Sequence, residues 1–376
     1  MLTSENRVLS FPLFSCMMDR EVLSLTNMLD YIRWRGDIPF SILPPGEVDG
    51  LILSQLSMIR WEEGLEEDAT LRFLVPRIQE EPVAVGFTAE NDRKLLDAIG
   101  TSERFGSLRI GDYVRRFDEQ SETQFAAITL HLPDDTLFVA FRGTDNTVVG
   151  WKEDFNMAFS EPVPAQECAR EYLTEIAERY PGPIRVGGHS KGGNLAMYAA
   201  ATVSQAVGER ILGVCNYDGP GLSDKMDTAG LYGRLDGKLQ SFLPQGSVVG
   251  LLLAHPETYT VVKSTSFGVF QHDPYSWQVE GPSFVRMPGL STESAKLDTA
   301  LRSWLAEMDE KDRTELVDTL FEVIRATDAK TFGREFWIGL SQNALNVGKT
   351  IRGLDPEKRA RVSKMITELG RLALQG

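Results

Sequence analysis

Hydrophobic and polar positions between residues 124 and 141 follow the pattern of two extended strands. Residues 124–132 (QFAAITLHL) alternate in polarity, and residues 136–141 (TLFVAF) form a β-branched and aromatic run. The intervening Pro133, Asp134 and Asp135 are residues that favour a tight turn. The pattern therefore predicts a hairpin that leads into a central sheet.

Apolar runs and helical stripes alternate in the following segment. Residues 165–179 carry apolar side chains at helical spacing and are followed by Pro181 and Gly182, which end helices. Short apolar runs at 184–188 and 211–217 lie on either side of a second apolar, helix-forming stretch. Further strands are predicted at 239–243 and 259–262, with a short helix or turn at 247–253 between them.

Strands separated by helices of this length predict right-handed crossovers and therefore a mostly parallel sheet of the α/β class. In such a sheet ligands bind at the carboxyl ends of the strands. We therefore expect the loops that follow Phe141, Gly188 and Tyr217 to converge on one site.

The two ends of the chain have a helical character. Residues 22–34 and 48–59 carry apolar side chains near helical spacing, and residues 62–100 are acidic, with a helical tendency that suggests a cap over the sheet. Asp49 lies within an apolar stretch, which favours a cap or a partner over catalysis. After Pro288 the chain is charged and helix-forming. Its two amphipathic stripes are Leu297, Leu301, Trp304 and Leu305, and Leu316, Leu320, Val323 and Ile324.

These patterns divide the chain into three parts. We predict a helical N-terminal region at 1–104, an α/β core at 105–289 and a C-terminal helical region at 290–376. The lengths favour one main domain with appendages over two equal halves.

Charge and cysteine content narrow the class of protein. The net charge of −15 over 376 residues argues against a basic surface for nucleic acid. Three cysteines, Cys16, Cys168 and Cys215, have neither disulfide nor zinc-site spacing. No apolar run approaches the roughly 20 residues of a membrane span, and the N-terminal run lacks a leader's cleavage site. We expect a cytoplasmic location, with no nucleic-acid partner and no cofactor; protein partners and oligomeric state stay open.

The stretch Gly188, Ser190 and Gly192 forms a G-x-S-x-G pattern between a predicted strand and a predicted helix. Such a turn holds a serine in a strained conformation with its hydroxyl exposed, and a side chain at either glycine would collide with a neighbouring element. A phosphate-binding loop is one alternative, but it needs Ser or Thr after the lysine, and Lys191 is followed by Gly192. A plain turn without chemistry is the other.

A serine hydroxyl needs a base to act as a nucleophile at neutral pH. The chain has four histidines, of which His131 and His189 precede Ser190. In the order nucleophile, acid, histidine, the base follows the serine, which leaves His255 and His272. We favour His272, because it ends a strand-like run at 267–271, whereas His255 lies in a turn-like sequence; a structural role for His272 is the alternative. At the sharp turn, His189 should point away.

The candidate acid is Asp218, which follows the strand at 211–217 and should lie at the same edge as Ser190. The alternative is a turn-forming aspartate beside glycine. Asp273 is adjacent to His272 in sequence, and neighbouring side chains rarely face each other closely enough to orient the ring.

An oxyanion hole needs preorganised donors. The backbone N–H of Lys191, the residue after the nucleophile, is one candidate. The second is the N–H of Thr144, in the loop after the strand that ends at Phe141.

These residues together resemble the class 3 lipase family. The resemblance rests on FRGT at 141–144, Trp151 and Asp154, and GHSKGG at 188–193, and it covers roughly residues 105–280. The chain looks closer still to a bacterial family of uncharacterised lipase-like hydrolases, which the QHDPYSW segment at 271–277 also resembles. The resemblance implies an α/β-hydrolase fold that acts on an ester.

The same resemblance implies Ser190 as nucleophile, His272 as base, and Thr144 and Lys191 as oxyanion donors. One feature departs from the family: residues 244–249 lack the carboxylate that class 3 lipases carry there. Either Asp218 replaces that carboxylate, or a weaker group such as the Ser247 hydroxyl orients the histidine.

Two functions follow from these observations. The first is a serine hydrolase that cleaves carboxylic esters, with acyl lipids as the implied substrates, through an acyl-enzyme on Ser190. The second is a catalytically weak or inactive binding or scaffold protein on the same fold. Nothing in the sequence separates ester, thioester and amide substrates.

Overall fold

The computed structural model describes residues 26–61, 69–78, 84, 88–121, 123–145, 148–157, 162–223, 225–226, 230–253, 258–292, 294–296, 353, 355–356 and 359–360. Its centre is a seven-stranded sheet in which every strand pairs with the next one in sequence. The strands are β1 (Arg109–Asp118), β2 (Thr123–His131), β3 (Leu137–Phe141), β4 (Ile184–His189), β5 (Ile211–Tyr217), β6 (Leu239–Pro244) and β7 (Thr260–Val262).

The sheet is mostly parallel, as the sequence predicts. Strands β3 to β7 run parallel, whereas β2 pairs antiparallel with both β1 and β3. Strand β1 was not predicted as a separate element, because most of its side chains are half-buried or exposed and give no clear apolar run. The predicted strands at 239–243 and 259–262 are confirmed as β6 and β7.

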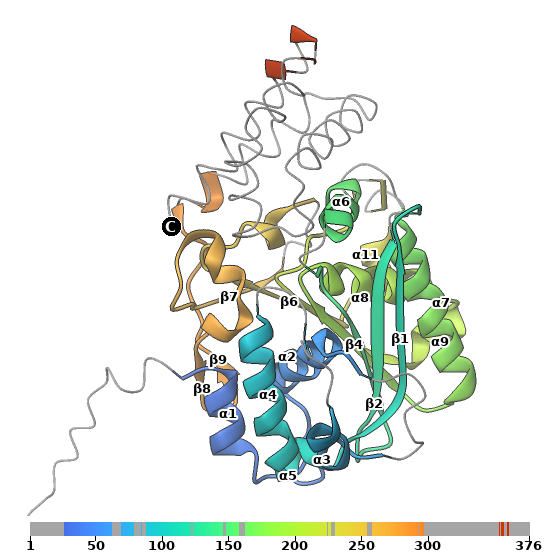
Figure 1. Cartoon of the computed structure of the whole chain (residues 1–376), viewed down its shortest axis with the longest axis vertical. Coiled ribbons are helices and arrows are strands. Elements are labelled where there is room, and N and C mark those ends of the chain that lie inside the picture. Colours follow the sequence, from blue (N-terminus) through green and yellow to red (C-terminus); the bar gives the residue numbers. More distant parts are fainter. Residues whose placement is uncertain are drawn as a thin grey trace, which may run out of the picture.

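Helices cover both faces of the sheet (Figure 1). Along β3, Val139 and Phe141 face the apolar cluster that contains the buried side chains of α7 (Pro164–Arg179) and α8 (Lys191–Thr202). The alternate residues Phe138 and Ala140 face the cluster that contains α2 (Glu47–Gln55). This two-residue alternation is what a strand buried on both faces requires. The shorter helices α9 (Gln205–Arg210) and α11 (Leu231–Arg234) follow α8 and precede β6.

The N-terminal helices share one apolar core with the sheet. They are α1 (Met28–Arg35), α2, η2 (Leu56–Met58), α3 (Leu71–Leu74), η3 (Val75–Arg77), α4 (Ala89–Thr101) and α5 (Glu103–Gly106). The helices predicted at 22–34 and 48–59 are present within the described residues. Helix α1 begins at Met28 because the Asn27 side chain caps it, accepting from the backbone N–H groups of Leu29 and Asp30.

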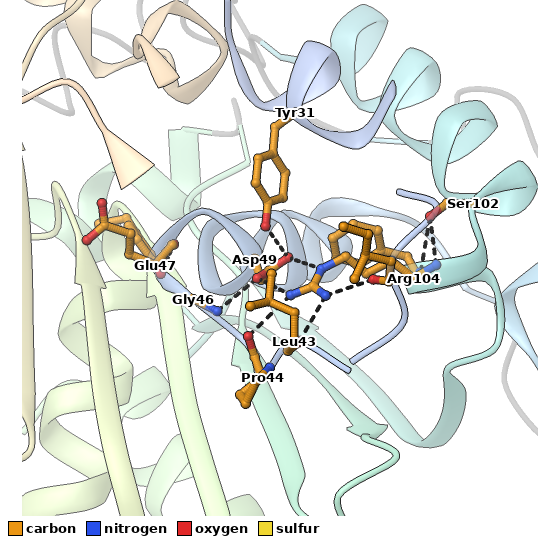
Figure 2. Close-up of polar contacts among 11 residues, drawn as sticks. Tyr31, Leu43, Pro44, Gly46, Glu47, Asp49, Ser102 and Arg104 are labelled. Atoms are coloured by element: carbon orange, nitrogen blue, oxygen red, sulfur yellow. Dashed lines mark hydrogen bonds and ion pairs between the residues drawn. The ribbon is translucent and has the colours of Figure 1, made fainter. Parts of the chain in front are cut away.

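A buried ion pair fastens α2 to the segments around it (Figure 2). Arg104 donates to both carboxylate oxygens of Asp49, at 2.7 Å from Nε and 2.6 Å from Nη2. Its Nη1 donates to the carbonyl oxygens of Ile38 and Leu43. Both charged side chains are fully buried. The partner expected for Asp49 is therefore Arg104, and the pair holds the N-terminal helices in one arrangement.

Replacing Arg104 with methionine should lower the free energy of unfolding by about 3–5 kcal/mol, because the Asp49 charge is left buried without its partner. Equilibrium urea unfolding measures this loss. Arg33→Met is the control, since Arg33 pairs with Asp30 at the surface and should change stability by about 0–1 kcal/mol. A loss at Arg104 no larger than that at Arg33 would contradict the assigned role of the pair.

A second buried group joins the N-terminal helices to the end of the α/β core. The Asp92 carboxylate on α4 accepts hydrogen bonds from Tyr275 Oη at 2.6 Å, Thr88 Oγ1 at 2.7 Å and Gln55 Nε2 at 3.1 Å. Burial raises the pKa of Asp92 to about 7. Tyr275 lies in η6 (Pro274–Ser276), three residues after His272. Helix α4 is thus bonded directly to the segment that carries the candidate base.

After β7 the chain forms a short hairpin, β8 (Val279–Glu280) and β9 (Ser283–Phe284). Both amphipathic stripes predicted after Pro288 lie outside the described residues. The domain boundaries at 104 and 289 stay predictions. None of the described helices has both the length and the apolar character needed to cross a bilayer.

Candidate active site

Ser190 lies at the sharp turn between β4 and α8, with φ 60° and ψ −134°. Two glycines make this turn possible. A Cβ at Gly188 would lie 2.2 Å from the backbone carbon of Gly192, and a Cβ at Gly192 would lie 2.1 Å from the carbonyl oxygen of Phe141. The predicted collision with neighbouring elements is therefore confirmed at both positions. The strained backbone holds Ser190 half-buried at the carboxyl end of β4.

His272 ends the 3₁₀-helix η5 (Gly268–His272) rather than a strand. The strand-like reading of 267–271 is wrong, because Gly268 adopts a positive φ of 52° and turns the chain. The imidazole nevertheless lies at the carboxyl edge of the sheet. Its Nδ1 is 2.7 Å from Asp218 Oδ2, so the structure brings together the base and the acid proposed from the sequence.

Asp218 follows β5 in a left-handed conformation, with φ 50°, and its side chain is fully buried. One carboxylate oxygen faces His272, and the other accepts a hydrogen bond from Ser247 Oγ at 2.5 Å. The sequence left Asp218 and Ser247 as alternative partners of the histidine. In the structure they form one chain, in which Ser247 bonds Asp218 and Asp218 bonds His272.

His189 lies against His272, contrary to the expectation that it would point away. The two rings are 4.7 Å apart between centroids, and His189 Nε2 donates to the carbonyl oxygen of His272 at 2.9 Å. Burial, reinforced by the nearby His272, holds the pKa of His189 well below its usual range. His189 is therefore neutral and supports the His272 ring as a packing and hydrogen-bonding group.

The expected convergence of loops can be followed through these contacts. The N–H of Ser190 donates to the carbonyl oxygen of Tyr217 at 2.9 Å. The residue after Tyr217 is Asp218, and the residue before Ser190 is His189. Both of these flanking residues contact His272, so the imidazole is held by the two loops that meet at Ser190.

Thr144 follows β3 in the loop next to the sharp turn at residues 188–192, which we call the elbow. A Cβ at Gly143 would lie 2.8 Å from the carbonyl oxygen of His189, so the loop abuts the residue before Ser190. Thr144 Oγ1 donates to Asp154 Oδ2 on α6 (Val148–Asn156). Burial raises the pKa of Asp154 to about 7, and the positive charge of Lys191 opposes that rise.

The Lys191 side chain carries a feature that sequence reasoning missed. The residue was considered for its backbone N–H alone, but its ammonium is buried and lies 2.8 Å from Glu153 Oε2. It also donates to the backbone and side-chain oxygens of Gln124, each at 2.8 Å. A lysine at the start of a largely apolar helix is a signal that could have indicated a buried carboxylate partner.

The remaining histidine and aspartate candidates either lie away from Ser190 or hydrogen-bond to the backbone. The His131 ring packs on Tyr180, with centroids 5.0 Å apart, at the opposite end of β2 from the elbow. Asp273 Oδ1 accepts from the backbone N–H of Tyr275 and caps η6, which agrees with its exclusion as the acid. His255 lies outside the described residues. Among the residues described, no group of three His, Cys, Asp or Glu side chains could hold a metal ion.

The mostly parallel sheet, the strained serine between β4 and α8, and the Asp218–His272 pair at the same edge are features of the α/β-hydrolase fold. The sequence model of the Mbeg1-like family matches residues 99–322. Because this match spans more than half of the chain, the protein belongs to the Mbeg1-like family. The more specific likeness to a bacterial family stays a prediction.

Three solved structures similar to this chain come from fungi. Lipase II from Rhizopus niveus is 17% identical with a TM-score of 0.35, and the match covers 57% of this chain and 81% of the lipase chain. The MDLA mutant form from Penicillium cyclopium is 12% identical with a TM-score of 0.39, covering 65% and 87%. A triacylglycerol lipase from Penicillium expansum is 14% identical with a TM-score of 0.28, covering 50% and 85%. No curated protein matches the chain.

Proposed function

We propose that this protein is a serine hydrolase that cleaves carboxylic esters through an acyl-enzyme on Ser190. The observation that carries the proposal is the 2.7 Å contact between His272 Nδ1 and Asp218 Oδ2 at the edge where Ser190 stands. A carboxylate at Nδ1 fixes the tautomer in which Nδ1 carries the hydrogen and Nε2 is free to accept a proton. That tautomer is the one a general base requires.

The reaction proceeds in two halves. Ser190 Oγ attacks the ester carbonyl carbon while its proton passes to His272 Nε2, and the carbonyl oxygen becomes an oxyanion held by the N–H groups of Thr144 and Lys191. The carbon–alkoxy bond then breaks, and His272 returns the proton to the leaving alcohol. In the second half, water attacks the acyl-enzyme with His272 again as base, which releases the acid and restores Ser190.

Asp218 stabilises the imidazolium that forms in both halves. Its carboxylate is fully buried and accepts from Ser247 Oγ and from His272. Since no positive side chain is bonded to it in the described part of the chain, its charge is directed at the protonated His272. The acid is thus supplied from the loop after β5, which explains how residues 244–249 can lack one.

A fluorophosphonate probe tests the proposal, because it reacts with an activated serine and leaves a stable phosphonyl adduct. We expect one adduct per chain, which peptide mass spectrometry assigns to Ser190. Circular dichroism of the same sample establishes that the protein is folded. A folded wild-type protein that takes no label would contradict the proposal and favour the binding or scaffold alternative.

Two exposed aromatic rings support an apolar ester as the substrate. Phe267 and Phe270 are each more than half exposed, and their ring centroids are 5.7 Å apart; Phe267 caps the short helix that ends at His272, and Phe270 lies within it. An acyl or alkyl chain that leaves the site on this side would cover them. Burial of such surface contributes about 25 cal/mol per Å².

Replacing both Phe267 and Phe270 with serine should therefore lower kcat/KM for octanoyl esters about tenfold or more, given the typical gain of about 1.5–3 kcal/mol for burying one large apolar side chain. Acetyl esters, which are too short to reach the rings, should lose less than about twofold. A series of p-nitrophenyl esters of increasing chain length measures both. Equal losses for short and long chains would contradict the assigned contact.

A further inference from the structure

The buried Lys191 ammonium connects the elbow to the loop that carries Thr144. Its three hydrogen bonds, all 2.8 Å, go to Glu153 on α6 and to two oxygens of Gln124 on β2. The Lys191 and Glu153 side chains are each only 1% exposed. A lysine with this degree of burial is costly unless it is paired and fully bonded, so its position is strongly determined.

Two routes lead from this ammonium to the Thr144 loop. Gln124 Oε1, which accepts from Lys191, also accepts from the backbone N–H of Asp145 at 3.4 Å. Asp154 Oδ1 lies 4.0 Å from the ammonium, and Asp154 Oδ2 accepts the hydroxyl hydrogen of Thr144. The loop is thus tied to Lys191 at two successive residues, through a backbone amide and through a side chain.

We propose that Lys191 is a positioning residue, whose side chain fixes the distance between the two N–H donors of the oxyanion hole. Its backbone N–H is one of the two donors, and its ammonium holds, through Gln124 and Asp154, the loop that supplies the other. This inference rests on the proposed hydrolase function and assigns a second role to a residue counted there for its amide alone.

The charges around Asp154 give this arrangement a pH dependence. Burial raises the pKa of Asp154 to about 7, and the negative charges of Glu153 and Asp145 raise it too, whereas Lys191 and the Thr144 hydrogen bond lower it. When Asp154 is ionised it accepts the Thr144 hydroxyl. When it is protonated, that charged hydrogen bond is lost. Lys191 therefore keeps the loop anchored at pH values where Asp154 would otherwise be neutral.

Lys191→Met tests the proposal, because it keeps most of the side-chain volume and removes the charge. We expect kcat for a p-nitrophenyl ester to fall about 10- to 100-fold, somewhat less than the loss of a whole oxyanion donor, with KM changed by less than about threefold. The acid limb of the kcat profile should also move to higher pH by about one unit, because an opposite charge nearby typically changes a carboxyl pKa by 1–3 units.

Glu153→Gln is the matched control, since it breaks the same ion pair but leaves the cation beside Asp154. Removing the Glu153 charge should lower the pKa of Asp154, so its acid limb should stay in place or move to lower pH. A purely structural ion pair predicts that both variants change alike, and that result would overturn the proposal. A Lys191→Met protein whose kcat equals that of the wild type would also overturn the proposal.

If Lys191→Met does not fold because Glu153 is left buried and unpaired, the double variant Lys191→Met/Glu153→Gln removes both charges, and the same fall in kcat is expected relative to Glu153→Gln alone. Fluorophosphonate labelling of the wild type distinguishes a failure of the proposed hydrolase function from a failure of the role proposed for the Lys191 side chain. No labelling refutes the hydrolase function itself, whereas normal labelling with an unchanged Lys191→Met profile refutes the role of the side chain alone.

Discussion

Ser190→Ala should lower kcat for ester hydrolysis by about 10⁶-fold, the loss seen when the nucleophile of a serine protease is removed. The acyl-enzyme cannot form without the Ser190 hydroxyl, and the oxyanion donors and His272 have nothing to activate. Alanine has the same Cβ as serine and so meets no new contact at the turn. The melting temperature should therefore stay within a few degrees of the wild type while activity and fluorophosphonate labelling are both lost.

An exposed serine supplies the control for this experiment. Ser107→Ala, on the surface after α5, should keep wild-type activity and labelling. A Ser190→Ala protein that retains more than about one hundredth of the wild-type kcat, after contamination is excluded by active-site titration, would show that hydrolysis proceeds through another group.

Asp218→Asn should lower kcat by about 10⁴-fold, as the equivalent change does in serine proteases. The asparagine amide would donate to His272 Nδ1, which then has to be the unprotonated nitrogen. The ring hydrogen moves to Nε2, and the base can no longer accept the proton of Ser190. Initial rates with a p-nitrophenyl ester measure the loss, and KM should change little because Asp218 is buried away from solvent.

Ser247→Ala provides the comparison, because it removes one hydrogen bond to Asp218 and leaves the Asp218–His272 contact in place. Its expected loss is about tenfold, in line with about 1–1.5 kcal/mol for one hydrogen bond. If Asp218→Asn lost no more than Ser247→Ala, Asp218 would not be the acid, and the histidine would be oriented by another group.

The elements that position the site follow from local sequence. Glycine at 188 is required by its contact with Gly192 in the same strand-turn-helix unit, and glycine at 192 is required by the carbonyl oxygen of Phe141 at the end of the adjacent strand β3, so the pattern predicts the turn from the elements next to it. Asp218 could be proposed because parallel strands bring their carboxyl ends to one edge, and its position after β5 is a matter of chain order. Both arguments use only neighbouring segments.

The contacts that sequence reasoning missed involve segments distant in the chain. Lys191 bonds to Glu153 on α6 and to Gln124 on β2, and no sequence spacing predicts that these three positions meet. The turn at Ser190 alone predicts that His189 points away, whereas its orientation depends on His272, which lies 83 residues further along. The apolar run at 267–271 resembles a strand, and the sequence gives no sign of the positive φ at Gly268 that turns the chain into a short helix.

The hydrogen bond between Asp92 and Tyr275 has a consequence for where the protein can be shortened. The segment that matches the Mbeg1-like family begins at residue 99, after Asp92. A gene trimmed to that segment would encode the serine, the histidine and the aspartate, yet it would omit the α4 carboxylate that anchors the loop bearing the histidine. Deletions from the amino-terminal side should therefore impair turnover before they reach any residue of the triad.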